Sequence, residues 1–177
     1  NNIIGFFNII DLVKKNNIKK FIYASTSSIY GIQKKFPLKE SYTTDNPIQL
    51  YAATKKSNEV IATSYSNLYK IHTIGLRFFT VYGPWGRPDM ALFKFTKNIL
   101  RNKPIEVFNR GKHQRDFTYI DDITDGISKI IESRSTKVLN EIFNIGNGKK
   151  INLIKYIKLI EKYLNKRSKK KFLSLQK

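Results

Sequence analysis

The segment Tyr51-Ala-Ala-Thr-Lys55 places a phenol and an ammonium group four residues apart. If the segment is helical, both side chains lie on one face, because residues at i and i+4 are neighbours on a helix. A cation beside a phenol favours the phenolate and lowers the pKa of the phenol, so Tyr51 could act as a general base near neutral pH. The pair alone is weak evidence, since an ordinary solvated helix face often carries the same spacing.

A cluster of hydroxyl side chains precedes this pair. The run Lys20-Phe-Ile-Tyr-Ala-Ser25 is rich in β-branched and aromatic residues and predicts a strand. Its end carries Ser25, Thr26, Ser27 and Ser28. Such hydroxyls can donate hydrogen bonds to a reacting oxygen. For Ser27 and Ser28, plain polarity at a strand end explains the pattern equally well, and both interpretations stay open.

The elements that must position these residues alternate between helix and strand. The periodicity predicts a helix over 2–15, a strand over 20–25, a helix over 51–69 and a strand over 71–78. This α/β alternation is typical of a doubly wound parallel sheet covered by helices, in which ligands bind beyond the carboxyl ends of the strands. Apolar residues on more than one side of the first helix predict that this helix is buried.

The second half of the chain is richer in loops. Its sequence predicts helices over 90–102, 123–133 and 153–164, strands over 105–108 and 142–145, and a basic tail over 166–171. We expect no metal site, because cysteine is absent and the two histidines are far apart in the sequence. We expect no membrane partner, because no apolar run approaches the roughly 18 residues of a membrane span. A cytoplasmic location fits this composition.

The charge balance is strongly basic. The 177 residues contain 33 Lys and Arg against 13 Asp and Glu, a formal net charge of +20. Lysine far outnumbers arginine, whereas nucleic-acid surfaces favour the planar fork of arginine. We therefore expect solvated lysine-rich faces and no specific nucleic-acid partner.

Four ordered segments resemble the nucleotide-sugar epimerases of the extended short-chain dehydrogenase/reductase superfamily, the NAD-dependent epimerase/dehydratase family. They cover 21–31, 51–55, 76–91 and 115–122. The third segment, Leu76-Arg-Phe-Phe-Thr-Val-Tyr-Gly-Pro-Trp-Gly-Arg-Pro-Asp-Met-Ala91, looks like the UDP-glucuronate 4-epimerases. The resemblance implies a partial Rossmann-like sheet with a small sugar-nucleotide-binding α/β region, NAD as cofactor and a UDP-sugar as substrate.

The resemblance also implies catalytic roles. Tyr51 would remove the proton of the sugar 4-hydroxyl while hydride passes to NAD, and Lys55 would lower the pKa of Tyr51 and bind the nicotinamide ribose. Thr26 would hydrogen-bond the same sugar oxygen and lie at the cofactor, assisted by its neighbours Ser27 and Ser28.

Further positions match the cofactor and substrate contacts of the family. Phe79 and Asn1 match residues on the cofactor side. Thr80 and Arg87 match the positions that hold the sugar carboxylate. An arginine suits this role because its fork grips a carboxylate through two parallel hydrogen bonds.

The remaining matches concern the nucleotide. Arg115 matches an arginine that binds the diphosphate. Phe108 is placed beside the uracil ring, although a plain core aromatic explains it equally well.

The dinucleotide-binding part of the family is missing from these residues. A Gly-rich turn that cradles the pyrophosphate is needed, and the one Gly-rich stretch, Ile145-Gly-Asn-Gly148, has the wrong spacing. We therefore predict a chain truncated at both ends, with a cofactor-binding half domain over 1–82 and an incomplete nucleotide-sugar region over 83–177. We expect this fragment to be inactive, and the resemblance implies a homodimer for the intact protein, paired through the first helix and the helix over 51–69.

Three alternatives remain. A 4,6-dehydratase would need an acid and a base beside Thr26, and Thr26-Ser-Ser-Ile-Tyr30 holds no Asp or Glu, which favours epimerisation. A different hexose epimerase would not need the carboxylate contact of Arg87. A non-catalytic basic fragment would bind through the tail over 166–171.

Overall fold

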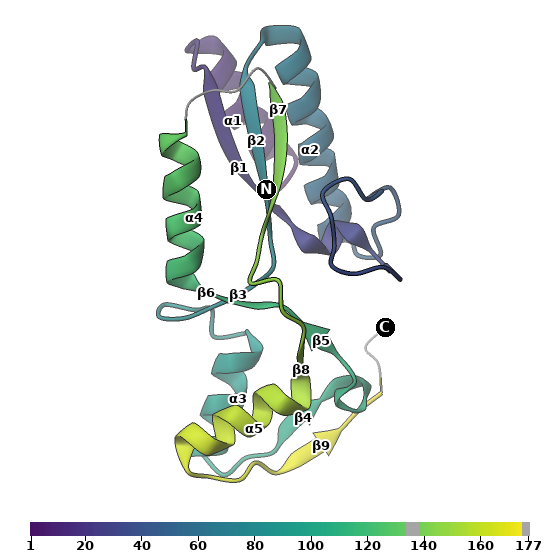
Figure 1. Cartoon of the computed structure of the whole chain (residues 1–177), viewed down its shortest axis with the longest axis vertical. Coiled ribbons are helices and arrows are strands. Elements are labelled where there is room, and N and C mark those ends of the chain that lie inside the picture. Colours follow the sequence, from purple (N-terminus) through teal and green to yellow (C-terminus); the bar gives the residue numbers. More distant parts are fainter. Residues whose placement is uncertain (134–138, 175–177) are drawn as a thin grey trace. The chain divides into compact units, whose positions relative to one another are not determined.

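The computed structural model describes residues 1–133 and 139–174 (Figure 1). The chain forms two compact units. The first contains Asn1–Phe79 and Ile123–Gly146, and the second contains Thr80–Asp122 and Asn147–Lys177. The predicted division into 1–82 and 83–177 concerns functional halves and stays a prediction, and its last residues, 175–177, lie outside the described part.

The first unit is built on a parallel sheet of three strands in the order β1-β2-β7. The strands are β1 (Lys20–Thr26), β2 (His72–Phe78) and β7 (Asn140–Ile145). Parallel neighbours need a crossover, and α2 (Leu50–Tyr69) supplies the one between β1 and β2. The predicted α/β architecture with a parallel sheet is confirmed.

Helix α4 (Ile120–Glu132) precedes β7 in the sequence. The Lys20 ammonium donates to the carbonyls of Ile130, Ile131 and Ser133, at 3.3, 3.0 and 2.7 Å. A cation at this position satisfies the unpaired carbonyls of the last turn and offsets the negative end of the helix dipole. The first residue of β1 thereby fixes the end of α4.

Helix α1 (Ile4–Lys15) packs on α2 and β1 through a core of Ile10, Tyr23 and Ala62. The prediction that this helix is buried on more than one side is wrong for the described part of the chain. Only Ile10 and Val13 of the helix are buried, because its neighbours cover one face. The exposed apolar side chains of the helix are Ile4, Phe7, Ile9 and Leu12.

The middle of the sheet depends on one glycine. A Cβ added to Gly75 in β2 would lie 2.6 Å from Ile142 Cδ1 and 2.7 Å from Tyr23 Oη. Side chains from both outer strands therefore meet over the bare backbone of the central strand, an approach that no larger residue permits.

The second unit combines helices α3 (Ala91–Leu100) and α5 (Leu153–Leu164) with three short strand pairs. The pairs are β3 (Thr80–Tyr82) with β6 (Phe117–Tyr119), β4 (Ile105–Val107) with β9 (Lys170–Phe172), and β5 (Gln114–Arg115) with β8 (Ile151–Asn152). The core includes a stacked pair, Phe117 and Tyr156, whose ring centroids lie 4.1 Å apart.

The long elements match the predicted ones within a few residues, and so does the short strand β4, whereas the other short strands were not predicted. Part of the predicted basic tail forms β9, because Glu161 accepts hydrogen bonds from Ser168 and Lys170 and holds the chain beside β4. The strand predicted over 105–108 ends at Val107, since Phe108 starts the short 3-10 turn η2 (Phe108–Gly111).

Candidate active site

Tyr51 and Lys55 lie on the first turns of α2, so the predicted helical spacing is confirmed. Tyr51 is half exposed, at 48%. The Lys55 ammonium donates to the carbonyl of Ala24 in β1 at 3.1 Å. Partial burial lowers the pKa of Lys55 below its ordinary value. Lys55 is thereby anchored to the strand that ends in Thr26.

Thr26 is the last residue of β1 and is buried. Its Oγ1 accepts a hydrogen bond from the Ser28 amide at 3.2 Å and so caps the 3-10 turn η1 (Ser27–Tyr30). A threonine hydroxyl that accepts one bond still has its proton to donate. Ser27 is half-buried and Ser28 is exposed, both in the first turn of η1.

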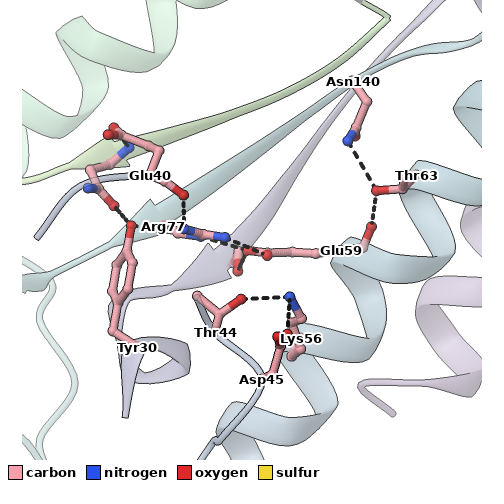
Figure 2. Close-up of polar contacts among 11 residues, drawn as sticks. Tyr30, Glu40, Thr44, Asp45, Lys56, Glu59, Thr63, Arg77 and Asn140 are labelled. Atoms are coloured by element: carbon pink, nitrogen blue, oxygen red, sulfur yellow. Dashed lines mark hydrogen bonds and ion pairs between the residues drawn. The ribbon is translucent and has the colours of Figure 1, made fainter. Parts of the chain in front are cut away.

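A buried ionic cluster adjoins these residues and was not predicted. Arg77 of β2 donates to both carboxylate oxygens of Glu59 of α2, through Nε at 3.0 Å and Nη2 at 2.9 Å. Ser25 Oγ donates to Oε1 of the same carboxylate at 2.6 Å. Figure 2 shows the Arg77 guanidinium facing Glu59, with Tyr30 and Glu40 on its other side. The sequence did hold a signal, an arginine within an apolar strand, where unpaired charge is rare.

The two further residues expected on the cofactor side also belong to the first unit. Phe79 follows the end of β2, is half-buried, and donates its backbone N–H to the carbonyl of Ile145 at 3.2 Å. Asn1 is exposed, and its carbonyl accepts from the Gly5 amide at 2.9 Å. The side-chain roles of Phe79 and Asn1 stay predictions.

The residues expected on the sugar side belong to the second unit. Thr80 begins β3 and donates its backbone N–H to the carbonyl of Asp116 at 3.1 Å. Arg87 is exposed, and its guanidinium holds the carboxylate of Asp89 through Nε and Nη2. This hydrogen bonding lowers the pKa of Asp89. The Arg87 fork thus holds a carboxylate of its own loop through two bonds, and its role toward a sugar carboxylate stays a prediction.

Arg115 lies on β5, where it is exposed and pairs with Ile151 of β8. The next residue, Asp116, accepts from the amides of Asn147 at 3.0 Å and Gly148 at 2.7 Å. The Gly-rich stretch that lacks the pyrophosphate spacing is therefore a turn bound by the neighbour of Arg115. Phe108 is half-buried at the start of η2.

Two absences concern the described residues only. Among residues 1–133 and 139–174, no group of three His, Cys, Asp or Glu side chains is placed to hold a metal ion. Over the same ranges, none of the helices has the length and apolar character needed to cross a membrane.

The donor set of the first unit fits the nicotinamide-ribose side of NAD. A lysine ammonium and a threonine hydroxyl lie at the carboxyl end of a parallel strand, the usual place for ligands in doubly wound sheets. The cradle for the pyrophosphate is not among these residues.

The comparisons with known proteins agree with this arrangement. An uncharacterized protein of Methanocaldococcus jannaschii is 54% identical over 175 residues, covering 99% of this chain and 53% of that protein. A probable UDP-glucuronate 4-epimerase of Rhizobium meliloti is 42% identical over 177 residues, covering 91% of this chain and 52% of that protein. The solved structure of UDP-glucuronic acid 4-epimerase from Bacillus cereus, in complex with UDP-glucuronic acid and NAD, matches with a TM-score of 0.90 and 37% identity, covering 99% of this chain and 55% of that one.

This chain spans about half the length of the relatives it matches. Residues 1–146 match the NAD dependent epimerase/dehydratase family. The resemblance of the four sequence segments is confirmed, and the chain belongs to the NAD dependent epimerase/dehydratase family.

Proposed function

We propose that this chain provides the catalytic and sugar-binding part of a NAD-dependent nucleotide-sugar 4-epimerase that interconverts UDP-glucuronate and UDP-galacturonate. The observation that carries the proposal is the placement of Tyr51 and Lys55 on one stripe of α2, with Lys55 bonded to the strand that ends in Thr26. The names of relatives and of the Bacillus cereus structure support the substrate class.

In this proposal Tyr51 accepts the proton of the sugar 4-hydroxyl, and Thr26 donates a hydrogen bond to the same oxygen. Lys55 stabilises the Tyr51 phenolate by its charge and holds the nicotinamide ribose. Bound NAD supplies the hydride acceptor and donor. Tyr51 returns the proton after the sugar presents its other face.

Thr80 and Arg87 hold the sugar carboxylate in this proposal. Oxidation at C4 produces a β-keto acid, which loses carbon dioxide when the carboxylate turns out of the plane that it shares with the carbon chain. A guanidinium that grips both carboxylate oxygens opposes this turn. Arg87 already shows the required two-bond geometry toward Asp89.

The remaining roles are assigned by the same family match. Arg115 binds the diphosphate, Phe108 lies at the uracil ring, Phe79 contacts the nicotinamide and Asn1 lies on the cofactor side. Residues 1–82 then form the catalytic half of the NAD-binding domain and residues 83–177 the nucleotide-sugar region, in a cytoplasmic enzyme.

We further propose that the intact protein is a homodimer paired through α1 and α2. The exposed apolar side chains of both helices support this pairing. On α1 they include Ile9 and Leu12, and on α2 they include Val60 and Leu68.

The 177 residues expressed alone are expected not to convert UDP-glucuronate. They contain no Gly-rich turn with the spacing that binds a dinucleotide pyrophosphate, so the main anchor for NAD is lacking. Anion-exchange chromatography of the reaction mixture measures this. Conversion at a rate near that of a full-length relative would contradict it.

The proposed function is tested by grafting residues 1–177 in place of the aligned segment of the Bacillus cereus enzyme. We expect this chimera to form UDP-galacturonate, and the same chimera with Tyr51→Phe to lose activity by about 10²- to 10⁴-fold, the usual contribution of a general base. A chimera that unfolds cooperatively and binds NAD, yet forms no product, overturns the proposal. If the chimera converted only neutral UDP-hexoses, the proposed substrate would be a neutral UDP-hexose and not UDP-glucuronate.

A further inference from the structure

Three polar residues form a row across the sheet of the first unit. Ser25 of β1 is the register partner of Arg77 of β2, and Arg77 is the register partner of Asn144 of β7. Each residue lies one position before its strand ends. The row therefore runs parallel to the carboxyl edge of the sheet, one residue inside it.

Hydrogen bonds link this row to α2 and to η1. The Glu59 carboxylate accepts from Ser25 Oγ at 2.6 Å and from Arg77 Nε and Nη2 at 3.0 and 2.9 Å. Arg77 Nη1 donates to Tyr30 Oη at 2.8 Å, and Tyr30 Oη donates to Asn144 Oδ1 at 2.7 Å. Figure 2 shows this chain of contacts from Glu59 through Arg77 to Tyr30.

The linked charges are buried. The exposed fractions are 3% for Ser25, 5% for Glu59 and 4% for Arg77. Burial tends to lower the pKa of Arg77, but its bonds to Glu59 and Tyr30 outweigh that effect and raise the pKa. A buried ion pair adds little stability over an apolar replacement, because desolvation offsets the attraction. Such a cluster does fix the relative position of the elements it joins, since each hydrogen bond tolerates only a narrow geometry.

The cluster lies directly beside the proposed catalytic residues. Tyr51, Lys55 and Glu59 follow one another at four-residue intervals on α2, so they share one stripe of the helix. Ser25 lies between Ala24, whose carbonyl accepts from Lys55, and Thr26. Two neighbouring residues of β1 are thus bonded to two successive residues of the same helix stripe.

We propose that Ser25, Glu59 and Arg77 are positioning residues, which fix α2 against the carboxyl end of β1 and so hold Tyr51 and Lys55 in register with Thr26. This inference rests on the proposed function, because the register matters for the reaction only if Tyr51, Lys55 and Thr26 are catalytic. A misplacement of about 1 Å at reacting groups costs roughly 10²-fold in rate.

The positioning is tested in the 177-residue chain by an NMR titration of the Lys55 ammonium. Ser25→Ala removes one hydroxyl and leaves the Arg77 and Glu59 pair in place, so this variant keeps the buried charges compensated. We expect the pKa of Lys55 to rise toward its ordinary value of 10.5 in Ser25→Ala, because Lys55 leaves its half-buried site on β1.

The matched control is Glu141→Gln. It perturbs another polar pair of the same sheet, in which His72 Nε2 and Glu141 Oε2 lie 2.6 Å apart near the amino ends of β2 and β7. We expect this variant to lower the melting temperature and leave the pKa of Lys55 unchanged. The inference is overturned if Ser25→Ala leaves the pKa of Lys55 at the wild-type value, or if Glu141→Gln raises it equally.

A second measurement separates this inference from the proposed function. In the Bacillus cereus chimera, Ser25→Ala is expected to lower kcat by about 10- to 100-fold with little change in KM, since the change displaces reacting groups without removing a substrate contact. An inactive parent chimera would count against the proposed function alone, and the Lys55 titration would still decide the positioning. An unchanged kcat in Ser25→Ala would overturn the positioning alone.

Discussion

Arg87 is the residue on which the proposed acidic-sugar substrate depends. Its guanidinium is exposed and engages the Asp89 carboxylate with two donors. A lysine at this place would retain the charge but lose the paired geometry.

We expect Arg87→Ala in the chimera to lower kcat/KM for UDP-glucuronate by about 10- to 100-fold, the range that corresponds to losing a hydrogen bond to a charged group. Turnover of a neutral UDP-hexose should change little. Arg87→Lys serves as the control and should recover only part of the loss. Equal losses for the acidic and the neutral sugar would remove the carboxylate role of Arg87.

Glu161 contributes to the stability of the second unit in a way that depends on pH. Burial tends to raise its pKa, but hydrogen bonds from Lys170 and Ser168 outweigh burial and lower the pKa from 4.5 to about 2. A carboxyl whose pKa is lower in the folded state contributes stability above its unfolded pKa and loses it as pH falls. This contribution is therefore full above pH 4.5 and disappears toward about pH 2.

We expect urea midpoints measured between pH 6 and pH 2 to fall less steeply for Glu161→Gln than for the wild type. Glu106→Gln, at an exposed position of β4, is the control and should keep the wild-type slope. If the urea midpoints of Glu161→Gln and the wild type fell equally with pH, the lowered pKa of Glu161 would be contradicted.

At the scale of elements, the space around a glycine differs between the sheet and α4. Gly75 lies in the central strand, where an added Cβ would meet Ile142 and Tyr23 at 2.6 and 2.7 Å. Gly126 lies inside α4, where an added Cβ would meet nothing within 4 Å. The same substitution therefore has opposite expected effects on stability.

We expect Gly75→Ala to lower the free energy of unfolding by about 1–3 kcal/mol, the usual cost of overpacking. Gly126→Ala should raise it by about 0.5–1 kcal/mol, because alanine is the better helix former. Urea denaturation of both variants measures the difference. A tolerated Gly75→Ala would mean that Tyr23 and Ile142 can move apart at little cost.

At the scale of the whole molecule, two features remain to be tested, the role of the net positive charge and the proposed dimer. The charge of +20 enters the proposed chemistry through few residues, chiefly Lys55, Arg87 and Arg115. A net positive field can draw in a polyanionic nucleotide sugar. The exposed apolar side chains of α1 form part of the proposed dimer contact.

We expect light scattering of the intact protein to report a dimer, and Ile9→Lys to shift that dimer toward monomer. Ile9 is 52% exposed on α1, and burying a lysine between paired helices is costly. The control is Tyr163→Lys, at an exposed position in the second unit, which should leave the dimer intact. A monomeric wild type, or a dimer unaffected by Ile9→Lys, would exclude pairing through this face.

The features that depend on local periodicity could be predicted from the amino-acid sequence. The helix over 51–69 follows from a 3.6-residue repeat, and that repeat alone places Tyr51 and Lys55 on one stripe. The α/β order and the hydroxyl cluster at the end of β1 were likewise predictable, because a strand and its terminal residues are contiguous. The short strands β8 and β9 were not, since their mainly polar residues form no apolar run and become strands only by pairing.

Contacts between residues far apart in the sequence could not be predicted and are seen only in the folded chain. Ser25 lies 34 positions before Glu59, and Glu59 lies 18 positions before Arg77, so no local pattern could join them. Their contact follows from the parallel register, which sets Ser25 beside Arg77, and from the packing of α2 over that pair. Likewise, the sequence of α1 shows that its faces are apolar, but the packing of α2 and β1 determines which of these faces is buried.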